Sequence, residues 1–312
     1  MAIGSGHEKN FNFRSSSRAK DFSPYADICL PRENGIRHRR ATVKVFIVYA
    51  HPDPKSHNGE LLRFSVQVLQ EAGHQVQVSD LYAMKWKAVA DREDFPWLGA
   101  TEQLDYGAAS GEAFSEKKQL PEIEAEQRKL LWADFVIFQF PLWWYSMPAI
   151  LKGWVERVYA LKFAYGIGEH GGERWGDRFG EGTLKGRKAM VAMTVGGREP
   201  HYRPRGVNGY MEDLLWPIQH GIFFYPGMDP LPAFVAYQVG HRTTPEEFEN
   251  IKADYRKRLL TFETTPIIQY RPQNGGDYDG QQVLKPGREG KGVTGLSIHQ
   301  INPRVKSYGG ES

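Results

Sequence analysis

The distribution of apolar positions predicts strands that alternate with helices from residue 43 onward. Residues 43–50 form a short apolar run rich in β-branched side chains, which is typical of a strand covered on both faces. Residues 135–140 and 189–194 repeat this pattern, while residues 75–79 alternate polar and apolar positions. A fifth short strand is predicted at Ala233 to Tyr237.

Amphipathic segments between these runs predict helices. Asn58 is expected to cap a helix that ends at Gly73. Its core face is predicted from apolar residues at helical spacing: Leu62, Val66, Leu69 and Ala72. Another helix is predicted between Ile150 and Leu161, and the last begins at a capping box, residues 244–247. Strands and helices in this order predict an α/β fold, an open parallel five-stranded sheet with helices on both faces.

The two ends of the chain differ in composition from its middle. Residues 1–41 contain clustered serines and basic residues without an apolar period, so we expect a disordered basic N-terminal extension. A transit peptide is the alternative, but four acidic residues argue against it: Glu8, Asp21, Asp27 and Glu33. Residues 42–272 are predicted to form the α/β domain, and the Gly- and Pro-rich residues 273–312 an irregular C-terminal extension.

Composition narrows the class of protein. The 312 residues include 40 Lys+Arg and 37 Asp+Glu, a net charge of +3 that gives no support to nucleic-acid binding. A single cysteine, Cys29, excludes a disulfide framework and indicates a reducing compartment. The longest uncharged stretch, residues 135–151, is interrupted by Pro141 and Pro148 and is too short to span a bilayer. We therefore expect a soluble cytoplasmic protein without an integral membrane segment.

Ligands of open parallel sheets bind at the carboxyl ends of the strands, so the loops that follow the strands are the candidate site. The first loop contains Ser56 and four further polar residues directly before a helix: His51, Lys55, His57 and Asn58. Such donors at a helix N-terminus suit a phosphate group, although an ordinary capped turn has the same composition. The P-loop pattern is absent, which disfavours a nucleotide triphosphatase.

The other two loops suggest a planar ligand. Residues 141–145, Pro-Leu-Trp-Trp-Tyr, place three aromatic side chains at the end of a strand. Aromatic residues usually fill a core, but consecutive residues cannot all face one core, so at least one should border a cavity or a subunit interface. Gly196 and Gly197 begin the third loop and let the backbone approach a ligand closely, although such pairs also occur in plain turns.

Three motifs are rejected. Residues 166–171 match Gly-x-Gly-x-x-Gly, but they follow a predicted helix and not a strand, so they do not indicate a dinucleotide site. His51 and His57 lack further ligands at metal-binding spacing, and we expect no metal. No Gly-x-Ser-x-Gly motif of a serine hydrolase is present.

The combination of motifs resembles the flavodoxin-like NAD(P)H:quinone oxidoreductases, the DT-diaphorase family. Seven segments carry the resemblance, which extends from Val43 to Ser297: residues 45–51, 79–84, 138–144, 148–158, 163–165, 215–219 and 295–297. The resemblance implies a flavodoxin-like catalytic domain at residues 42–272, FAD at the carboxyl edge of the sheet, and a homodimer. It also implies a ping-pong reaction, in which a hydride passes from NADH or NADPH to the flavin and then to a quinone; another flat small-molecule acceptor is also possible.

The resemblance also assigns residues to the site. The implied cofactor-binding residues are His51, Ser56, His57, Asn58, Pro141, Leu142, Trp143, Trp144, Tyr145, Thr194, Gly196, Gly197 and Tyr202. Tyr202 matches the tyrosine that donates a hydrogen bond to the flavin, and Asn208 stands at the position of its histidine partner. The implied substrate pocket contains Trp144 together with three residues contributed across the dimer: Ala164, Tyr165 and Gly166.

The chain departs from the family pattern at three positions. Because Asn208 cannot carry a proton at neutral pH, Tyr202 is expected to act alone, with His201 or with water. Ile167 replaces a pocket tyrosine, and Phe248 lies near the position of an arginine that supports the FAD adenine, so FMN is possible. A flavodoxin-type electron carrier and a non-catalytic regulatory subunit of a potassium-efflux-type system remain alternatives. The preference between NADH and NADPH stays open.

Overall fold

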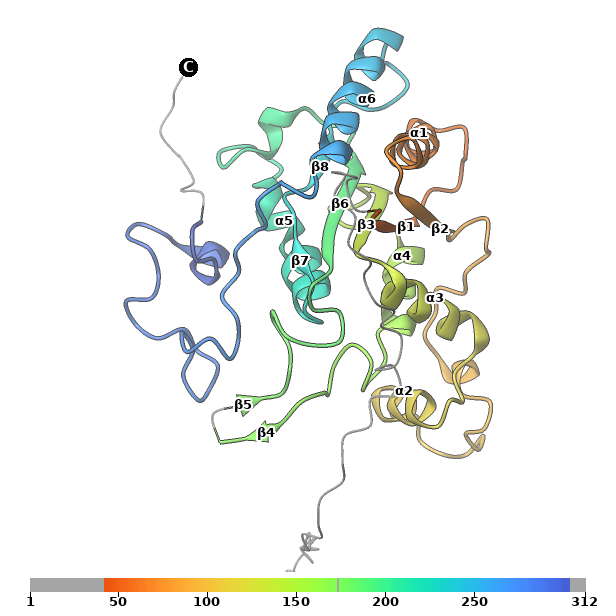
Figure 1. Cartoon of the computed structure of the whole chain (residues 1–312), viewed down its shortest axis with the longest axis vertical. Helices are drawn as coiled ribbons and strands as arrows, with labels where there is room; N and C mark the ends of the chain where they lie inside the picture. The colour runs from red at the N-terminus through yellow and green to blue at the C-terminus, as the bar shows by residue number, and fades with distance from the viewer. Residues whose placement is uncertain (1–41, 173, 304–312) are drawn as a thin grey trace, which may run out of the picture. The chain divides into compact units, whose positions relative to one another are not determined.

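The computed structural model describes residues 42–172 and 174–303. The predicted N-terminal extension, residues 1–41, and the last residues of the predicted C-terminal extension lie outside the described residues. Figure 1 shows the arrangement of the helices and strands.

A parallel sheet forms the centre of the fold. Its first four strands follow the spatial order β2 (Gln75–Asp80), β1 (Lys44–Tyr49), β3 (Phe135–Pro141) and β6 (Lys188–Thr194). Two short strands share the fifth position: β7 (Asp229–Pro230) pairs with the beginning of β6 and β8 (Phe234–Ala236) with its end. Pro230 and Pro232 have no N–H group to donate, which explains the interruption. The predicted open parallel five-stranded sheet is confirmed.

Helices cover both faces of the sheet, as predicted (Figure 1). One face packs against α1 (His57–Glu71) and α6 (Pro245–Leu260). The other face packs against α3 (Pro121–Trp132), α4 (Ala149–Val158) and α5 (Met211–Ile218), which continues into the π-helical segment η3 (Gln219–Phe224). Successive strand residues alternate between the two cores, because strand side chains alternate in direction.

The first helix departs from the prediction at its beginning. Ser56, and not Asn58, is the N-cap, and its hydroxyl accepts a hydrogen bond from the N–H group of Gly59. Asn58 lies inside the first turn and is buried. The core face is also rotated: Leu69 is fully buried as predicted, but the other predicted residues are only partly buried. The positions that are buried with Leu69 are Leu61, Ser65 and Val68.

The remaining helical predictions hold with shorter bounds. α4 ends at Val158, before the predicted Leu161, and α6 begins with the predicted capping box at Thr244 and Glu247. The Gly-rich residues 166–171 lead into an antiparallel hairpin of β4 (His170–Gly171) and β5 (Arg174–Trp175), so no strand–loop–helix unit exists there. This hairpin context agrees with rejection of the dinucleotide motif.

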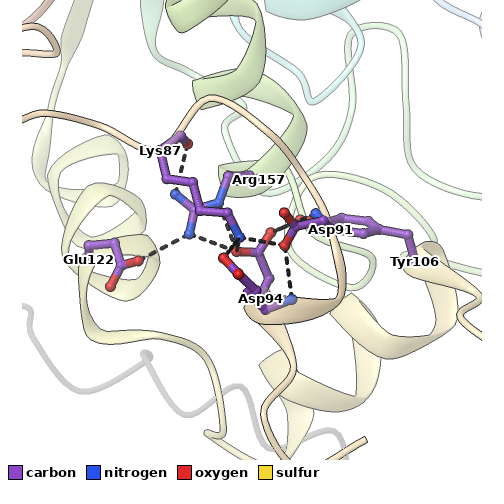
Figure 2. A network of polar contacts seen from close by, with 7 residues as sticks. Lys87, Asp91, Asp94, Tyr106, Glu122 and Arg157 are labelled. Atoms are coloured by element: carbon purple, nitrogen blue, oxygen red, sulfur yellow. Dashed lines mark hydrogen bonds and ion pairs between the residues drawn. The ribbon is translucent and has the colours of Figure 1, made fainter. Parts of the chain in front are cut away.

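A buried polar network anchors the end of α4 (Figure 2). The guanidinium of Arg157 donates two buried hydrogen bonds to Asp94 Oδ1, at 3.0 and 2.8 Å. It donates a third hydrogen bond to Glu122 on α3, at 3.0 Å. Asp94 is the last residue of the 3-10 turn η1 (Arg92–Asp94), and Tyr106 is the first residue of α2 (Tyr106–Ser115). The hydroxyl of Tyr106 donates a further hydrogen bond to Asp94 at 2.9 Å. The network therefore joins four elements of the fold.

The chain after α6 is irregular as far as residue 303, apart from the 3-10 turn η4 (Gly295–His299). Tyr270, Arg271 and Gln273 of this segment are buried. Arg271 donates to the carbonyl of Ile298 at 3.0 Å and pairs with Asp277 at 2.6 Å. The proposed domain boundary at residue 272 stays a prediction.

Candidate active site

The three predicted loops begin at the carboxyl ends of neighbouring parallel strands, β1, β3 and β6. The ends of β3 and β6 are adjacent in register, because Pro141 pairs with Thr194. The N–H group of Leu142 then donates to the carbonyl of Thr194 at 2.9 Å. The three loops that contain the cofactor-binding residues implied by the resemblance therefore begin at one edge of the sheet.

The first loop is held by its own polar groups. The N–H group of Asp53 donates to His51 Nδ1 at 3.0 Å, and Ser56 Oγ lies 3.0 Å from the same nitrogen. Ser56 also donates to the carbonyl of Asp53 at 2.7 Å. Burial lowers the pKa of His51, which favours the neutral imidazole.

A chain of buried amides ties the first loop to the third. Asn58 Nδ2 donates to Thr194 Oγ1 at 3.0 Å, and Gln139 Nε2 donates to the carbonyl of Asn58 at 2.8 Å. The hydroxyl of Tyr255 on α6 donates to Gln139 Oε1 at 3.3 Å. Gln139 and Tyr255 were not identified from the sequence, although a glutamine inside an otherwise apolar strand was the available signal. These hydrogen bonds fix the first turn of α1 against the end of β6.

The aromatic loop is a tight turn in a strained conformation. Trp143 and Ser146 exchange two backbone hydrogen bonds, each of 3.0 Å. The two central residues, Trp144 and Tyr145, have φ angles of 48° and 62°, a region that usually requires glycine or asparagine. Trp144 is 96% exposed, and Tyr145 and Trp143 are also exposed. Exposed aromatic rings on a strained turn indicate a surface that another molecule covers.

The other two loops contain unpaired backbone N–H groups. In the described part of the chain, no hydrogen bond engages the N–H groups of Gly196 and Gly197. The first-turn N–H groups of His57 and Asn58 are likewise without partners there. A Cβ atom on Gly197 would lie 2.9 Å from the ring of Tyr202, so the close packing at this position requires glycine. The loops thus offer four backbone donors to a polar ligand.

Tyr202 and Asn208 lie together, as the resemblance implied. Burial raises the pKa of Tyr202, while a hydrogen bond from the side chain of Asn208 partly opposes this rise. Asn208 also accepts a hydrogen bond from the hydroxyl of Tyr145 at 3.2 Å. His201 is exposed, and its carbonyl accepts a hydrogen bond from the N–H group of Asn208 at 3.0 Å. The expectation that Tyr202 acts alone, with His201 or with water stays a prediction.

The predicted substrate residues lie elsewhere in the chain. Tyr165 packs against the beginning of α2, where a Cβ atom on Gly107 would lie 3.4 Å from its hydroxyl. Ala164 is buried and Gly166 is exposed in the same turn. This turn follows the end of α4, which runs back from the carboxyl edge of the sheet, and in Figure 1 α2 lies at the opposite edge. Within one chain, therefore, these three residues do not join Trp144.

Two further features border the predicted site. Phe248 is buried and packs edge-on against His57, with ring centroids 4.6 Å apart, so an apolar wall stands near the position of the family arginine. A cavity of about 640 Å³ between α5, β8 and the C-terminal segment shares only Tyr202 with the predicted site. The side chains of Trp143, Trp144 and Tyr145 are exposed at this edge of the sheet, and this exposed aromatic surface is called the shelf below.

Within residues 42–303, Glu173 aside, no three His, Cys, Asp or Glu side chains are grouped as metal ligands. Across the same residues, no helix combines the length and the apolar character needed to cross a bilayer.

Comparison with known proteins agrees with this fold. A family model described as the flavodoxin-like fold matches residues 43–259, and the chain belongs to this family. The chain is 51% identical over 258 residues to a ribosyldihydronicotinamide dehydrogenase-like protein of Penicillium crustosum, covering 82% of this chain and 95% of that protein. It is 38% identical to an NAD(P)H dehydrogenase [quinone] 1 of Cavia porcellus, over 72% of this chain and 79% of that protein.

A solved structure shows the same similarity. A protein of Klebsiella pneumoniae, named as a candidate quinone reductase, is 50% identical and superposes with a TM-score of 0.80. The match covers 83% of this chain and all of that chain.

Proposed function

We propose that the protein is a flavin-dependent NAD(P)H:quinone oxidoreductase. The observation that carries this proposal is the exposed, strained aromatic turn at Trp144 and Tyr145, next to the unpaired N–H groups of Gly196 and Gly197. An aromatic face beside fixed backbone donors suits a planar ring with a polar rim. The names of the relatives in Penicillium crustosum and Cavia porcellus support a dehydrogenase, and the latter name specifies a quinone.

The residues present fit a flavin. Trp144 and Tyr145 offer aromatic faces for its ring system, and Gly196 and Gly197 offer donors for the carbonyl and nitrogen groups of its rim. The free first-turn N–H groups of His57 and Asn58, at the N-terminus of α1, would hold a phosphate. FAD is the proposed form, with FMN as the alternative because Phe248 replaces the expected arginine. A bound flavin supplies reversible two-electron chemistry, accepting hydride from NADH or NADPH and passing it to a quinone.

Tyr202 is proposed as the catalytic donor. Tyr202 is 8% exposed, and its ring is held between Gly197 and Tyr237, which fixes the position of its hydroxyl oxygen. A fixed donor in a partly desolvated site stabilises negative charge without reorganisation. Asn208 can orient this hydroxyl but cannot exchange a proton with it at neutral pH.

A homodimer is proposed to complete the site. The aromatic shelf is exposed in one chain, and Trp144 is 96% exposed. A second copy would cover this surface and supply Ala164, Tyr165 and Gly166, which lie at the other edge of the sheet within one chain. Covering the shelf would exclude water from the transfer of hydride.

Steady-state oxidation of NADH and NADPH, with and without menadione, separates this function from its alternatives. Menadione-dependent turnover of either nucleotide is the expected result. Bound flavin without turnover would instead favour an electron carrier or a regulatory subunit.

The variant Tyr202→Phe tests the proposed donor. Removing one preorganised donor is expected to slow flavin reduction about 100-fold, equivalent to about 3 kcal/mol. Stopped-flow absorbance of the bound flavin measures this rate. An unchanged rate in a folded, flavin-loaded variant would remove Tyr202 from the mechanism.

A further inference from the structure

We propose that the protein binds an aromatic carboxylate, one ring with a short acidic side chain, between the β4–β5 hairpin, η3 and the C-terminal segment. Two cavities form this site, with volumes of about 230 and about 400 Å³. Gln273, Tyr278 and Gln282 line both cavities, so the cavities adjoin and one ligand can occupy the two together. The site shares no residue with the three loops of the candidate active site, so the proposal does not depend on the proposed redox function.

Five aromatic side chains line the smaller cavity, which we call the aromatic cavity. His220 is stacked between Trp216 and Phe179, whose ring planes are inclined to its own by 19° and 27°. Tyr278 and His299 form a second pair of nearly parallel rings, inclined by 15° to each other. Aromatic walls favour a flat aromatic ligand, and a cavity of about 150 Å³ is already large enough for benzene. The aromatic cavity therefore suits one substituted ring.

Hydrogen-bonding groups of this cavity are free to meet a ligand. Among the described residues, neither ring nitrogen of His220 takes part in a hydrogen bond, and His299 uses only its Nδ1, which lies 2.9 Å from the hydroxyl of Tyr278. Because rings cover both faces of His220, it meets the cavity with its edge, which carries the two nitrogens. A neutral imidazole offers one donor and one acceptor nitrogen. We therefore expect a hydroxyl group on the ligand ring to strengthen binding.

Lys285 supplies the positive charge for a carboxylate. It lines the larger cavity, which we call the polar cavity, and its ammonium group donates to the carbonyl of Gly276 at 2.9 Å. In the part of the chain that the structure describes, Lys285 has no acidic partner. The other charged side chains that line the two cavities are already engaged in ion pairs or hydrogen bonds: Arg174, Arg271 and Asp279. An acidic group on the ligand would therefore pair with Lys285.

Hydrogen bonds fix the walls of the two cavities. The β4–β5 hairpin and the C-terminal segment lie side by side (Figure 1), and the side chain of Gln273 donates to the carbonyl of Trp175 at 3.3 Å. The N–H group of Gln273 also donates to the carbonyl of Phe179 at 3.2 Å. On the other side, the buried guanidinium of Arg271 donates to the carbonyl of Ile298 at 3.0 Å. Because these bonds hold the cavities open, a ligand can bind with little loss of conformational freedom in the protein.

Isothermal titration calorimetry of the full-length protein with 3-(4-hydroxyphenyl)propanoate tests the proposal. We expect saturable one-to-one binding with a Kd below about 1 mM, equal in flavin-loaded and flavin-free protein. 3-Phenylpropanoate should bind about threefold more weakly because it lacks the hydroxyl, and 3-cyclohexylpropanoate about tenfold more weakly because it lacks the aromatic ring. Absence of saturable binding, or equal affinity for the cyclohexyl compound, would overturn the proposal.

Two pairs of variants locate the bound acid. Leu296→Trp, at the exposed rim of the aromatic cavity, should weaken binding at least about tenfold by filling the cavity. Its control Ile301→Trp, similarly exposed but outside both cavities, should not. Lys285→Met should weaken binding of the acid about threefold without affecting its methyl ester, and the control Lys291→Met should affect neither. Wild-type affinity in Leu296→Trp, or equal weakening of acid and ester by Lys285→Met, would overturn the proposal, whether or not the protein reduces menadione.

Discussion

Trp144 combines an unfavourable backbone conformation with a side chain that contributes little to the packing of one chain. Its φ angle is 48° and its ring is 96% exposed. Backbone strain of this kind costs about 1–3 kcal/mol and persists where function requires it. At the scale of the residue, we therefore attribute the presence of Trp144 to ligand binding and not to the stability of the fold.

Replacement of Trp144 tests this explanation. Trp144→Gly should change the free energy of unfolding by less than about 1 kcal/mol, because relief of strain and the added entropy of the unfolded chain offset each other. The affinity for flavin should fall about tenfold or more with the loss of the aromatic face. Urea unfolding and flavin titration measure the two quantities, with Trp175→Ala on β5 as a control. A large loss of stability with unchanged flavin affinity would make Trp144 a structural residue.

The network around Arg157 acts at the scale of elements. Its guanidinium and the carboxylate of Asp94 are both fully buried, and they join α4 to η1, α2 and α3 (Figure 2). Removing one partner of a buried ion pair leaves the other charge uncompensated. The position of these helices thus depends on a complete network.

Arg157→Met should lower the free energy of unfolding by about 3–5 kcal/mol. A second change, Asp94→Asn, should recover part of this loss because it removes a buried carboxylate that Lys87, 3.4 Å away, compensates only in part. The matched control is Arg128→Met, which breaks an exposed pair with Glu124 and should cost less than about 1 kcal/mol. Equal losses in Arg157→Met and Arg128→Met, by urea unfolding, would show that burial of the network adds nothing.

The elements that the sequence predicted are those with a strong local pattern. The buried strands were identified because both faces of the sheet are covered, which leaves continuous apolar runs. The helices α2 and α3 were not identified: α2 is rich in Ala, Gly and Ser and has no strong apolar period. The cap of α1 was assigned to Asn58 because Ser56 and Asn58 are both good capping residues, and only the contact with Thr194 distinguishes them.

Part of the candidate site was also predictable from the sequence. Its loops follow from the rule for parallel sheets, so the positions of Gly196, Gly197 and the aromatic turn were expected. The contacts that fix it join residues far apart in sequence, such as Tyr145 with Asn208 and Gln139 with Tyr255. Local patterns carry no information about such pairs. The positive φ angles of the turn were equally hidden, because tryptophan and tyrosine normally avoid them.

At the scale of the whole molecule, the C-terminal segment packs against η3 through aromatic rings. His220 is stacked between Trp216 and Phe179, with ring centroids 4.4 and 4.7 Å away, and Tyr270 lies edge-on at 5.0 Å. Burial lowers the pKa of His220 to about 4, and burial also lowers the pKa of His299 on η4. The packed state therefore favours neutral histidines.

Acid should weaken this packing. Because the unfolded chain binds a proton at His220 near pH 6.5 and the folded chain only near pH 4, stability is complete above about pH 6.5 and falls toward pH 4. Between pH 7.5 and pH 5 His220 should contribute a loss of about 2 kcal/mol. His220→Phe, which keeps the stacking, should remove most of that loss in urea unfolding. The same pH dependence in variant and wild type would exclude His220 as its source.

Anaerobic titration of the purified protein with NADPH and NADH, followed by its visible spectrum, tests the central claim most directly. We expect a yellow protein whose absorbance near 450 nm is lost on addition of about one equivalent of reduced nucleotide per flavin and is restored by menadione. The mass of the released cofactor then distinguishes FAD from FMN. A colourless protein that binds neither added FAD nor FMN, or a bound flavin that neither nucleotide reduces, would contradict the account.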